Sequence, residues 1–512
     1  MKYERFRKLI SNNFDLSMEH YGFWSLLPPL IAIIFAIKTR QVFVSLLFGI
    51  WLGWIILSAG NILTGTTSTI QALVDVFKDA GNTRTIMFSC LVGALIAFIQ
   101  RSGGVAGFVN LINNFLNYLE AKKIGKSRKM VQLLAWATGT SIFVESSINT
   151  LTVGTVFRPI FDRLKIPREK LAYIGDSISA PTCILIPLNA WGAYIMGLIA
   201  AQGFSNPLTV LIYAFPLNFY PMLAMAMVLF VILSGKDFGP MKKAEERAIK
   251  EGKVIRDGAV PLISSDVVSL EKKENVTAKA MNMIIPIIVM VGMMPLMLLY
   301  TGWGNVENIS QYPWYEQIFF AIGKGSGSTA VLYSVLTSII VGSILYISQK
   351  IFTFQETIDL IFKGISGLIP LALLMMLAFA IGTVCRELGT GIYTAELSKQ
   401  WLSPNFVPVI IFIVACFIAF STGTSWGTFA IMIAIGIPMA QALNANLYLT
   451  LAAALGGGVF GDHCSPISDT TIISSMASAS DHIDHVKTQL PYALTAGAIT
   501  AVIYLILGIL IH

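Results

Sequence analysis

Long apolar runs constrain this chain more than any other feature of its sequence. Only 12% of its 512 residues are charged, whereas soluble globular chains carry about a quarter. The runs are continuous and do not alternate with polar residues, which favours helices over a β-barrel. The sequence therefore predicts an all-α polytopic membrane protein. The runs lie near 23–37, 41–58, 86–100, 131–160, 171–202, 208–234, 280–301, 328–347, 364–385, 406–440, 447–476 and 489–511.

The net charge of +7 comes from basic residues in short loops between the apolar runs. Lys and Arg concentrate in such loops on the cytoplasmic side of a membrane. The segments 120–129, 158–170 and 235–279 are basic and are predicted to be cytoplasmic, whereas 302–316 has no Lys or Arg and suits the outer face. We expect a lipid bilayer as the environment, the bacterial inner membrane as the location, and neither a nucleic-acid partner nor a cofactor.

Two short motifs occur twice, in the same order, in the two halves of the chain. "ATGTSIF" at 137–143 is matched by "STGTSWG" at 421–427, and "GDSIS" at 175–179 is matched by "GDHCS" at 461–465. The separations are 284 positions for Gly139 and Gly423 and 286 for Gly175 and Gly461. Such recurrence indicates a duplicated unit. The predicted divisions are an N-terminal segment 1–22, a first repeat 23–234, a charged and solvated cytoplasmic linker 235–279, and a second repeat 280–512.

The two repeats are predicted to have opposite orientation, because the loops of the second half are poor in Lys and Arg. Each repeat would contain a re-entrant hairpin, at 131–160 and at 406–440, with its "TGTS" motif near the tip. A broken transmembrane helix would follow each hairpin, since Gly- and Pro-rich stretches such as 456–475 interrupt the apolar pattern. Interrupted segments in matching positions of inverted repeats point to the binding site of a secondary transporter. The side of the membrane on which the N-terminus lies is left open.

Four carboxylates in or beside apolar runs are candidate cation- and proton-binding groups: Asp462, Asp176, Glu145 and Asp469. A carboxylate within a membrane is costly and is functional by default. It can exchange a proton for Na+, because burial favours the neutral form and a bound cation favours the charged form. Asp176 and Asp462 each follow a glycine and are expected at equivalent places in the two repeats. The alternative interpretation is a helix cap or an ion pair.

The hydroxyls at the hairpin tips are the other candidate ligands, since hard oxygen atoms suit a small cation. A purely structural role, bonding their own helix, is the alternative. The hydroxyl candidates are Thr138, Thr140, Ser141, Thr422, Thr424 and Ser425, and the proposed Na+ ligands among all candidates are Thr138, Ser141, Thr422, Ser425 and Asp462.

A further group of residues near the breaks is predicted to line a substrate cavity, with packing or backbone bonding as the alternative. Arg386 and Glu387 are interpreted as a local ion pair at a membrane face. The predicted lining residues are Ser177, Asn189, Trp191, His463 and Ser465.

The stretch "GGGVFGDHCSPISDTTIISS" at 456–475, with "TGTS" in both halves and "GDSISAP" in the first, resembles the NhaC-type Na+/H+ antiporters of the ion-transporter superfamily. The resemblance covers about 25–510. It implies exchange of Na+ for H+, two inverted repeats, a scaffold domain, a transport domain that moves like an elevator, and a homodimer. The same family includes exchangers of organic anions, such as malate/lactate antiporters.

The predicted function is therefore Na+/H+ antiport by alternating access, without enzymatic activity. The alternative is a Na+-coupled transporter or exchanger of a small organic acid or amino acid. An intramembrane aspartyl protease is disfavoured, because a doubled hairpin has no role in it. A channel is disfavoured because two matched hairpins suit alternating access better than a continuous pore.

Overall fold

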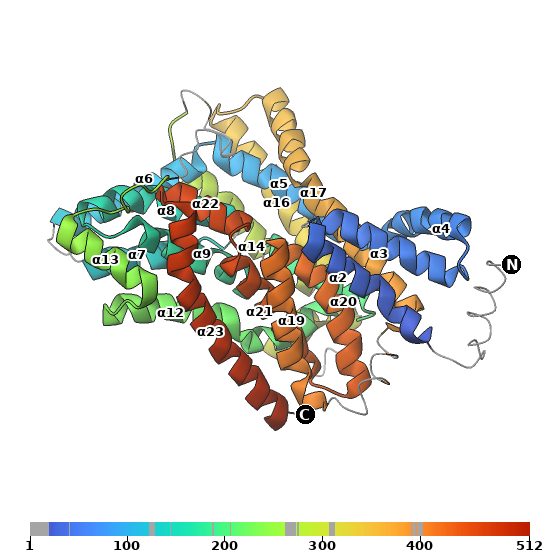
Figure 1. Cartoon of the computed structure of the whole chain (residues 1–512). Coiled ribbons are helices and arrows are strands. Elements are labelled where there is room, and N and C mark those ends of the chain that lie inside the picture. The colour runs from blue at the N-terminus through green and yellow to red at the C-terminus, as the bar shows by residue number, and fades with distance from the viewer. Residues whose placement is uncertain are drawn as a thin grey trace.

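The structure is a computed structural model, and almost all of its described residues that form regular structure are helical (Figure 1). Among these residues the only β-contact is an isolated bridge between Pro261 and Asp481. The prediction of an all-α chain is confirmed. The described residues are 20–511 except 40, 122–127, 144, 187–188, 205, 262–272, 274–275, 307–312, 391–392, 394–395 and 397–402. Most of the predicted N-terminal segment and part of the predicted linker lie outside the described residues.

The helices follow one another with short connections. In the first half they are η1 (Gly22–Leu26), α2 (Leu27–Thr39), α3 (Val42–Leu57), α4 (Ile62–Asp75), η2 (Val76–Lys78), α5 (Ala80–Arg101), α6 (Gly104–Ala121), α7 (Arg128–Ser141), α8 (Ser146–Arg163), α9 (Arg168–Leu185), α10 (Ala190–Ala201), α11 (Pro207–Ala214), η4 (Phe215–Leu217), α12 (Phe219–Ser234) and α13 (Gly239–Glu251). In the second half they are α14 (Met281–Gly302), η5 (Trp303–Asn305), α15 (Trp314–Lys324), α16 (Gly327–Ser348), α17 (Phe354–Glu387), η7 (Pro404–Phe406), α19 (Val407–Thr422), α20 (Ser425–Leu443), α21 (Leu447–Cys464), α22 (Asp469–Ser478) and α23 (His482–Leu510).

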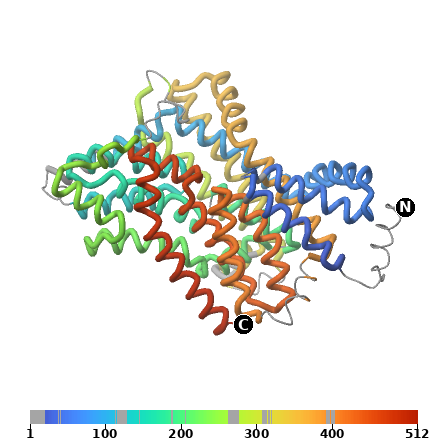
Figure 2. Tube along the Cα trace, in the orientation of Figure 1, coloured from blue at the N-terminus to red at the C-terminus, as the bar shows by residue number. Residues whose placement is uncertain are grey.

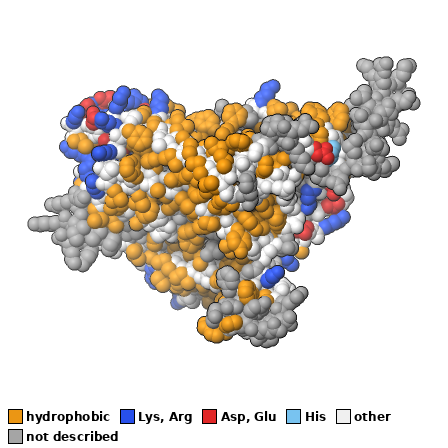
Figure 3. Space-filling model, turned by 90° about the horizontal axis from the view of Figure 1, so that it is seen from below, with side chains coloured by type: hydrophobic (Ala, Val, Ile, Leu, Met, Phe, Trp, Pro, Cys, Tyr) orange, Lys and Arg blue, Asp and Glu red, His pale blue; other side chains and the backbone are white. Residues whose placement is uncertain are grey.

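Among the described residues, 8 helices are long and apolar enough to cross a membrane. A ninth candidate is the pair α9 and α10, which meet at 49°. Hydrophobic side chains cover much of the surface seen from below in Figure 3, as expected of a surface that faces lipid tails. The chain is a multi-pass membrane protein.

A pattern of helix, break and helix occurs twice with a constant spacing. Helices α7, α8, α9 and α10 begin 279 positions before α19, α20, α21 and α22 respectively (128 to 407, 146 to 425, 168 to 447 and 190 to 469). Both "TGTS" motifs lie at the tips of the predicted hairpins, at the end of α7 and between α19 and α20. The inverted orientation of the two units stays a prediction.

The spacing of 279 differs from the 284 and 286 positions that separate the repeated motifs. Asp176 is the ninth residue of α9, whereas Asp462 is the sixteenth residue of α21. In the helix register Asp462 corresponds to Cys183, and Asp176 corresponds to Leu455. The expectation that the two aspartates occupy equivalent positions is therefore wrong, because the motif match is shifted by about two helical turns relative to the helices.

Close packing fixes the helices around these units. A Cβ on Gly93 of α5 would lie 2.2 Å from the backbone oxygen of Gly364 of α17, so the two helices touch through their backbones. A Cβ on Gly461 of α21 would lie 2.5 Å from backbone atoms of α19. Small residues at such crossings are how helices pack tightly where no water drives association. Figure 2 shows α22 and α23 beside helices of the first half, although the two sets are far apart in sequence.

The predicted linker is not merely solvated. Residues 239–251 form α13, which packs against α9 and α23. Lys170 of α9 bonds Asp237 and Glu245 at 2.7 Å each, and Arg247 of α13 bonds Glu169 at 2.9 Å. Ion pairs therefore join the described part of the linker to the first turn of α9.

Candidate functional site

Four helix N-termini follow interruptions in the repeated units. Two are at the hairpin tips, and two are at the helix breaks, the first break between α9 and α10 and the second between α21 and α22. The N-cap residues are Glu145 for α8, Asn189 for α10, Thr424 for α20 and Ser468 for α22. Each N-terminus exposes backbone N–H groups and carries the positive end of a helix dipole. The breaks therefore concentrate polar backbone inside an otherwise apolar bundle.

Asp462 lies at the second break with both carboxylate oxygens bonded to hydroxyls. Ser425 Oγ donates to Oδ2 at 2.9 Å, and Ser468 Oγ donates to Oδ1 at 2.6 Å. Ser425 is the first residue of α20 and Ser468 is the N-cap of α22, so one carboxylate joins three helix ends. Only 2% of Asp462 is exposed. This arrangement suits a group that binds a proton or a small cation.

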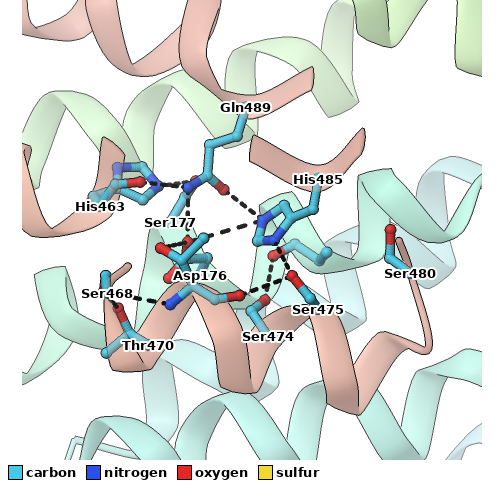
Figure 4. Close-up of polar contacts among 12 residues, drawn as sticks. Asp176, Ser177, His463, Ser468, Thr470, Ser474, Ser475, Ser480, His485 and Gln489 are labelled. Carbon is cyan, nitrogen blue, oxygen red and sulfur yellow. Dashed lines mark hydrogen bonds and ion pairs between the residues drawn. The ribbon is translucent and has the colours of Figure 1, made fainter. Parts of the chain in front are cut away.

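Asp176 lies nearby in α9, also buried, and has different partners (Figure 4). Thr471 Oγ1 and Gln489 Nε2 both donate to its Oδ2, at 3.0 and 2.7 Å. His485 Nε2 lies 3.8 Å from the same oxygen. The other oxygen, Oδ1, is buried and has no hydrogen-bond partner among the described residues. A buried, unsatisfied carboxylate oxygen is costly and is free to accept a proton.

His463 and Gln489 connect the two carboxylate regions. The ring of His463 bonds Ser177 Oγ at 2.9 Å and Tyr220 Oη at 2.7 Å, and its backbone oxygen accepts a hydrogen bond from Gln489 Nε2 at 2.6 Å. The same Gln489 amide bonds Asp176. Figure 4 shows Gln489 reaching toward both His463 and Asp176. The predicted lining residues Ser177 and His463 therefore contact each other beside Asp176.

The first break is held by an amide instead of a carboxylate. The two Nδ2 hydrogens of Asn189 are shared among the backbone oxygens of Phe143, Cys183 and Ile186, which lie 2.6, 2.8 and 3.0 Å from Nδ2. Its Oδ1 accepts a hydrogen bond from Gly192 N and caps α10. Trp191 packs against Trp426 of the second hairpin, with ring centroids 4.9 Å apart and the ring planes tilted by 50°. These two predicted lining residues thus fasten the first break to both hairpins.

Ser465 performs a related task at the second break. Its Oγ donates to the backbone oxygen of Phe420 at 2.8 Å, which joins the end of α21 to the end of α19. Gly423, with a φ of 68°, ends α19 in the left-handed region and lies against Ile467. The tip of the second hairpin therefore rests on the break next to Asp462.

The remaining candidates make local contacts. Glu145 accepts a hydrogen bond from Ile148 N at 2.8 Å as the cap of α8, and Asp469 accepts one from Thr470 N at 2.8 Å. The hydroxyls of Thr140, Ser141 and Thr422 donate to backbone oxygens of their own helices. Among the described residues no hydrogen bond joins Thr138, Ser141, Thr422 or Thr424 to Asp462, so their role as ligands stays a prediction.

Sequence reasoning missed the partners of the aspartates. Ser468, Thr471 and Gln489 bond the two carboxylates. His485 lies next to Asp176, and Tyr220 bonds His463. Ser468 could have been found as the serine before Asp469 at a helix start. Gln489 sits one helix away from the motif, and no local pattern marks it.

Within the described part of the chain, no group of three or more His, Cys, Asp or Glu side chains is placed to hold a metal ion. The donors at Asp462 are instead one carboxylate and two hydroxyls. Hard oxygen donors of this kind suit an alkali cation better than a transition metal.

A family model described as the Na+/H+ antiporter family matches residues 182–509. The chain belongs to this family. The match includes the second hairpin, Asp462 and Gln489, whereas Asp176 lies just before it.

Relatives extend the comparison over the whole antiporter chain. An uncharacterized protein from Haemophilus influenzae is 33% identical over 499 residues, which are 95% of this chain and 91% of that one. The malate-2H+/Na+-lactate antiporter of Bacillus subtilis is 30% identical over 164 residues, 31% of this chain and 34% of that protein. The chain thus matches about a third of the length of that relative.

Solved structures support the fold of this antiporter family member. The YdaH transporter of Alcanivorax borkumensis, described as having an unusual topology, aligns with a TM-score of 0.54 at 12% identity and covers 86% of this chain and 88% of that one. MtrF of Neisseria gonorrhoeae aligns with a TM-score of 0.52 at 13% identity over 86% of this chain and 84% of that one. Membership of the family makes the protein a secondary transporter, and these neighbours support its fold.

Proposed function

We propose that the protein exchanges Na+ for protons across the bacterial cytoplasmic membrane, with Asp462 as the group that both ions share. The observation that carries this proposal is the bonding of Asp462, whose two oxygens accept hydrogen bonds from Ser425 and Ser468. Each hydroxyl keeps lone pairs with which it can coordinate a cation while it donates to the carboxylate. The family supports Na+ and H+ as the exchanged ions.

In the proposed mechanism Na+ and H+ compete for the same carboxylate. Proton loss leaves a charged Asp462 that attracts Na+, and the positive N-terminal end of α22 helps to stabilise that charge. Na+ release on the other side of the membrane leaves a buried charge that is satisfied by taking up a proton. Because the site holds either Na+ or H+ and never both, each ion crosses the membrane in the opposite direction to the other, which is antiport.

We assign Asp176 a supporting part in this mechanism. Its bonds to Thr471 of α22 and Gln489 of α23 hold these helices against α9, close to Asp462. Its free Oδ1 offers a second place for a proton during exchange. Elevator-like movement and a homodimer belong to the same proposal and follow from family resemblance.

The test is transport by purified protein in proteoliposomes with a pH-sensitive dye inside and an imposed pH gradient. Added Na+ should collapse the gradient. Asp462→Asn should lower the rate by at least about 100-fold, since it removes the charge that attracts the cation. Asp484→Asn is the matched control, because Asp484 is a carboxylate whose ion-pair partner is the exposed Arg256 and not a side chain that bonds Asp462. Equal Na+-driven rates in Asp462→Asn and the wild type would contradict the proposal.

A further inference from the structure

Two histidines in the first turn of α23 share one serine hydroxyl of α22. Ser475 Oγ lies 3.0 Å from His482 Nδ1 and 2.9 Å from His485 Nδ1. Figure 4 shows His485 between Ser475 and Gln489, beside Asp176. Ser475 and His485 are fully buried, whereas His482 is partly exposed. These three residues, the His–Ser–His cluster, form a continuous polar connection from the surface to the buried carboxylate.

The hydrogen on one ring nitrogen of His485 follows from its contact with Gln489. The amide nitrogen of Gln489 donates to Asp176 Oδ2 at 2.7 Å and to the backbone oxygen of His463 at 2.6 Å. The amide oxygen therefore faces His485 Nε2, at 2.9 Å, and an amide oxygen only accepts hydrogen bonds. His485 must carry a hydrogen on Nε2.

The ring of His482 is fixed in the same way by a backbone oxygen. Its Nε2 lies 2.6 Å from the oxygen of Pro466, between α21 and α22, and this oxygen also only accepts. His482 therefore carries a hydrogen on Nε2 as well. A neutral imidazole has a single N–H group. If both rings are neutral, both Nδ1 atoms are acceptors that need a donor.

Ser475 cannot satisfy two neutral rings. Its hydroxyl has one hydrogen, and three acceptors surround it, namely the two Nδ1 atoms and the backbone oxygen of Thr471 at 2.9 Å. Two neutral rings would leave at least one Nδ1 lone pair facing the Ser475 oxygen with no hydrogen between them. One added proton removes this conflict, because one ring then donates from Nδ1 to Ser475 Oγ and the hydroxyl donates to the other ring. The geometry is that of a site for one proton shared by two histidines.

The positive charge of that proton has a partner in Asp176. Asp176 Oδ2 lies 3.8 Å from His485 Nε2, and its Oδ1 is buried without a hydrogen-bond partner in the described part of the chain. A buried imidazolium needs such a countercharge. The other charged or titratable groups on the elements around the rings are already paired or hydrogen-bonded: His463 with Tyr220 and Ser177, Arg168 with Asp162, Lys170 with Asp237, Asp484 with Arg256, and Asp481 with backbone N–H groups.

The exposed end of the cluster lies on the predicted cytoplasmic side. The linker contacts the start of α23, since Arg256 pairs with Asp484 at 2.9 Å and Val260 N donates to Asp481 Oδ2 at 2.9 Å. The linker is rich in Lys and Arg, which favours the cytoplasmic side. His482 lies between these two aspartates in sequence, so the cluster meets water on that side.

We propose that the His–Ser–His cluster holds one proton and passes it between the cytoplasmic solution and Asp176. This proposal rests on the proposed function and deepens it, because it supplies a path by which protons enter and leave the protein. In the first step, His482 gives its Nδ1 proton to Ser475 Oγ while Ser475 gives its own hydrogen to His485 Nδ1. The imidazolium thereby moves from one ring to the other, and every hydrogen bond of the cluster is kept.

In the second step, His485 gives its Nε2 proton to the carboxylate of Asp176, which leaves a neutral ring and a neutral carboxylic acid. The two atoms must approach each other by about 1 Å to form the hydrogen bond along which this proton moves. Both steps run in reverse when a proton leaves toward the cytoplasm.

The first experiment compares two kinds of exchange by the purified full chain in proteoliposomes. Na+-driven proton flux needs the cluster, whereas exchange of radiolabelled for unlabelled Na+ at equal pH on both sides does not. His482→Ala should slow the proton flux by roughly 100-fold and leave Na+/Na+ exchange unchanged. Dissolved imidazole should restore part of the flux, because it carries protons in place of the partly exposed ring. His20→Ala, which removes a histidine bonded to Glu396, is the matched control and should behave as the wild type.

Ser475→Ala should slow the proton flux in the same way, without rescue by imidazole, because the missing hydroxyl is buried. Wild-type proton flux in both His482→Ala and Ser475→Ala would overturn the proposal. An equal loss of proton flux and Na+/Na+ exchange in both variants would overturn it too, because that result indicates a purely structural role.

Nitrogen NMR of full-length protein labelled at histidine detects the shared proton without transport. The chain has five histidines, so single variants can assign the signals. The Nδ1 signals of His482 and His485 should change together over a pH series, and Ser475→Ala should separate them. Independent titration of the two rings in the wild type would overturn the proposal. A shared proton in a wild type that exchanges no Na+ for H+ would support the cluster and overturn the proposed function, so the two failures are distinguishable.

Discussion

The two helix breaks of this protein have the same position in their units and different chemistry. At the first break, Asn189 bonds three backbone oxygens and caps α10, and aromatic rings pack around it. At the second, Ser468 caps α22 and bonds Asp462, whose register position in the first unit is occupied by Cys183. The amide at the first break bonds backbone oxygens around it, whereas the carboxylate at the second leaves a charge to be neutralised.

The polar side chains at the two breaks therefore differ in what they do. The first break is built for rigidity, because its polar side chain is saturated by backbone partners. In the proposed function the second break is where the ions exchange, because a proton or a cation is needed to balance Asp462. The helix pattern then occurs twice, and the carboxylate that both ions share lies in the second unit. The following predictions test this contrast.

The largest effect on stability is expected at the first break. Asn189→Ala removes both amide donors, which three backbone oxygens share, and one helix cap, and should cost about 3 kcal/mol. Ser468→Ala, the equivalent change at the second break, removes fewer bonds and should cost about 1 kcal/mol while it weakens Na+-driven exchange. Thermal unfolding in detergent, with transport measured in parallel, checks both variants. Equal destabilisation by the two changes would remove the contrast.

The next effect concerns the two "GD" motifs. A Cβ on Gly461 would lie 2.5 Å from backbone atoms of α19, so Gly461→Ala should destabilise the protein by about 2 kcal/mol. A Cβ on Gly175 would make ordinary contacts, with Ser474 Oγ at 3.5 Å and methyl carbons of Thr150 and Val153 at 3.9 Å, so Gly175→Ala should be neutral or slightly stabilising. The thermal unfolding midpoints of the two variants, compared with that of the wild type, measure this difference in stability. A similar loss in both would mean that the motifs share one environment.

A smaller effect, on the Na+ dependence of exchange, is expected to distinguish Ser146 and Ser425, the first residues of α8 and α20. Ser425→Ala removes a donor to Asp462, and the Na+ concentration for half-maximal exchange should rise about tenfold. Ser146→Ala should change it by less than about twofold, because Ser146 Oγ only approaches Glu145 at 3.4 Å. Exchange rates measured over a Na+ series in proteoliposomes give both numbers. A larger shift in Ser146→Ala would move the cation site to the first hairpin.

Much of the fold could be predicted from the sequence, because apolar runs and Lys/Arg-rich loops report directly on membrane helices. The Gly- and Pro-rich stretch after residue 456 also predicted the break beside Asp462. The register of the duplication could not be derived in the same way. The short motifs align by their glycines and hydroxyls, which gives separations of 284 and 286 positions. The helix starts align at a separation of 279 positions, so the two aspartates differ by about two helical turns.

The site was predicted in part for a similar physical reason. Local chemistry singled out Asp462, Asp176, Ser425 and His463, which the structure brings together. Their partners Gln489, Thr471 and Tyr220 come from other helices, and only tertiary packing places them. Arg386 was predicted to form an ion pair with Glu387, its neighbour in sequence. In the structure Arg386 instead lines two hollows, of about 540 and 390 Å³.

The most direct test of the central claim is the number of protons released when Na+ is added to purified protein in weakly buffered detergent solution. If Na+ and H+ share Asp462, the wild type and Asp484→Asn should release protons in a saturable manner, and Asp462→Asn should release none. Proton release by Asp462→Asn equal to that of the wild type would contradict the account and move the shared site to another carboxylate.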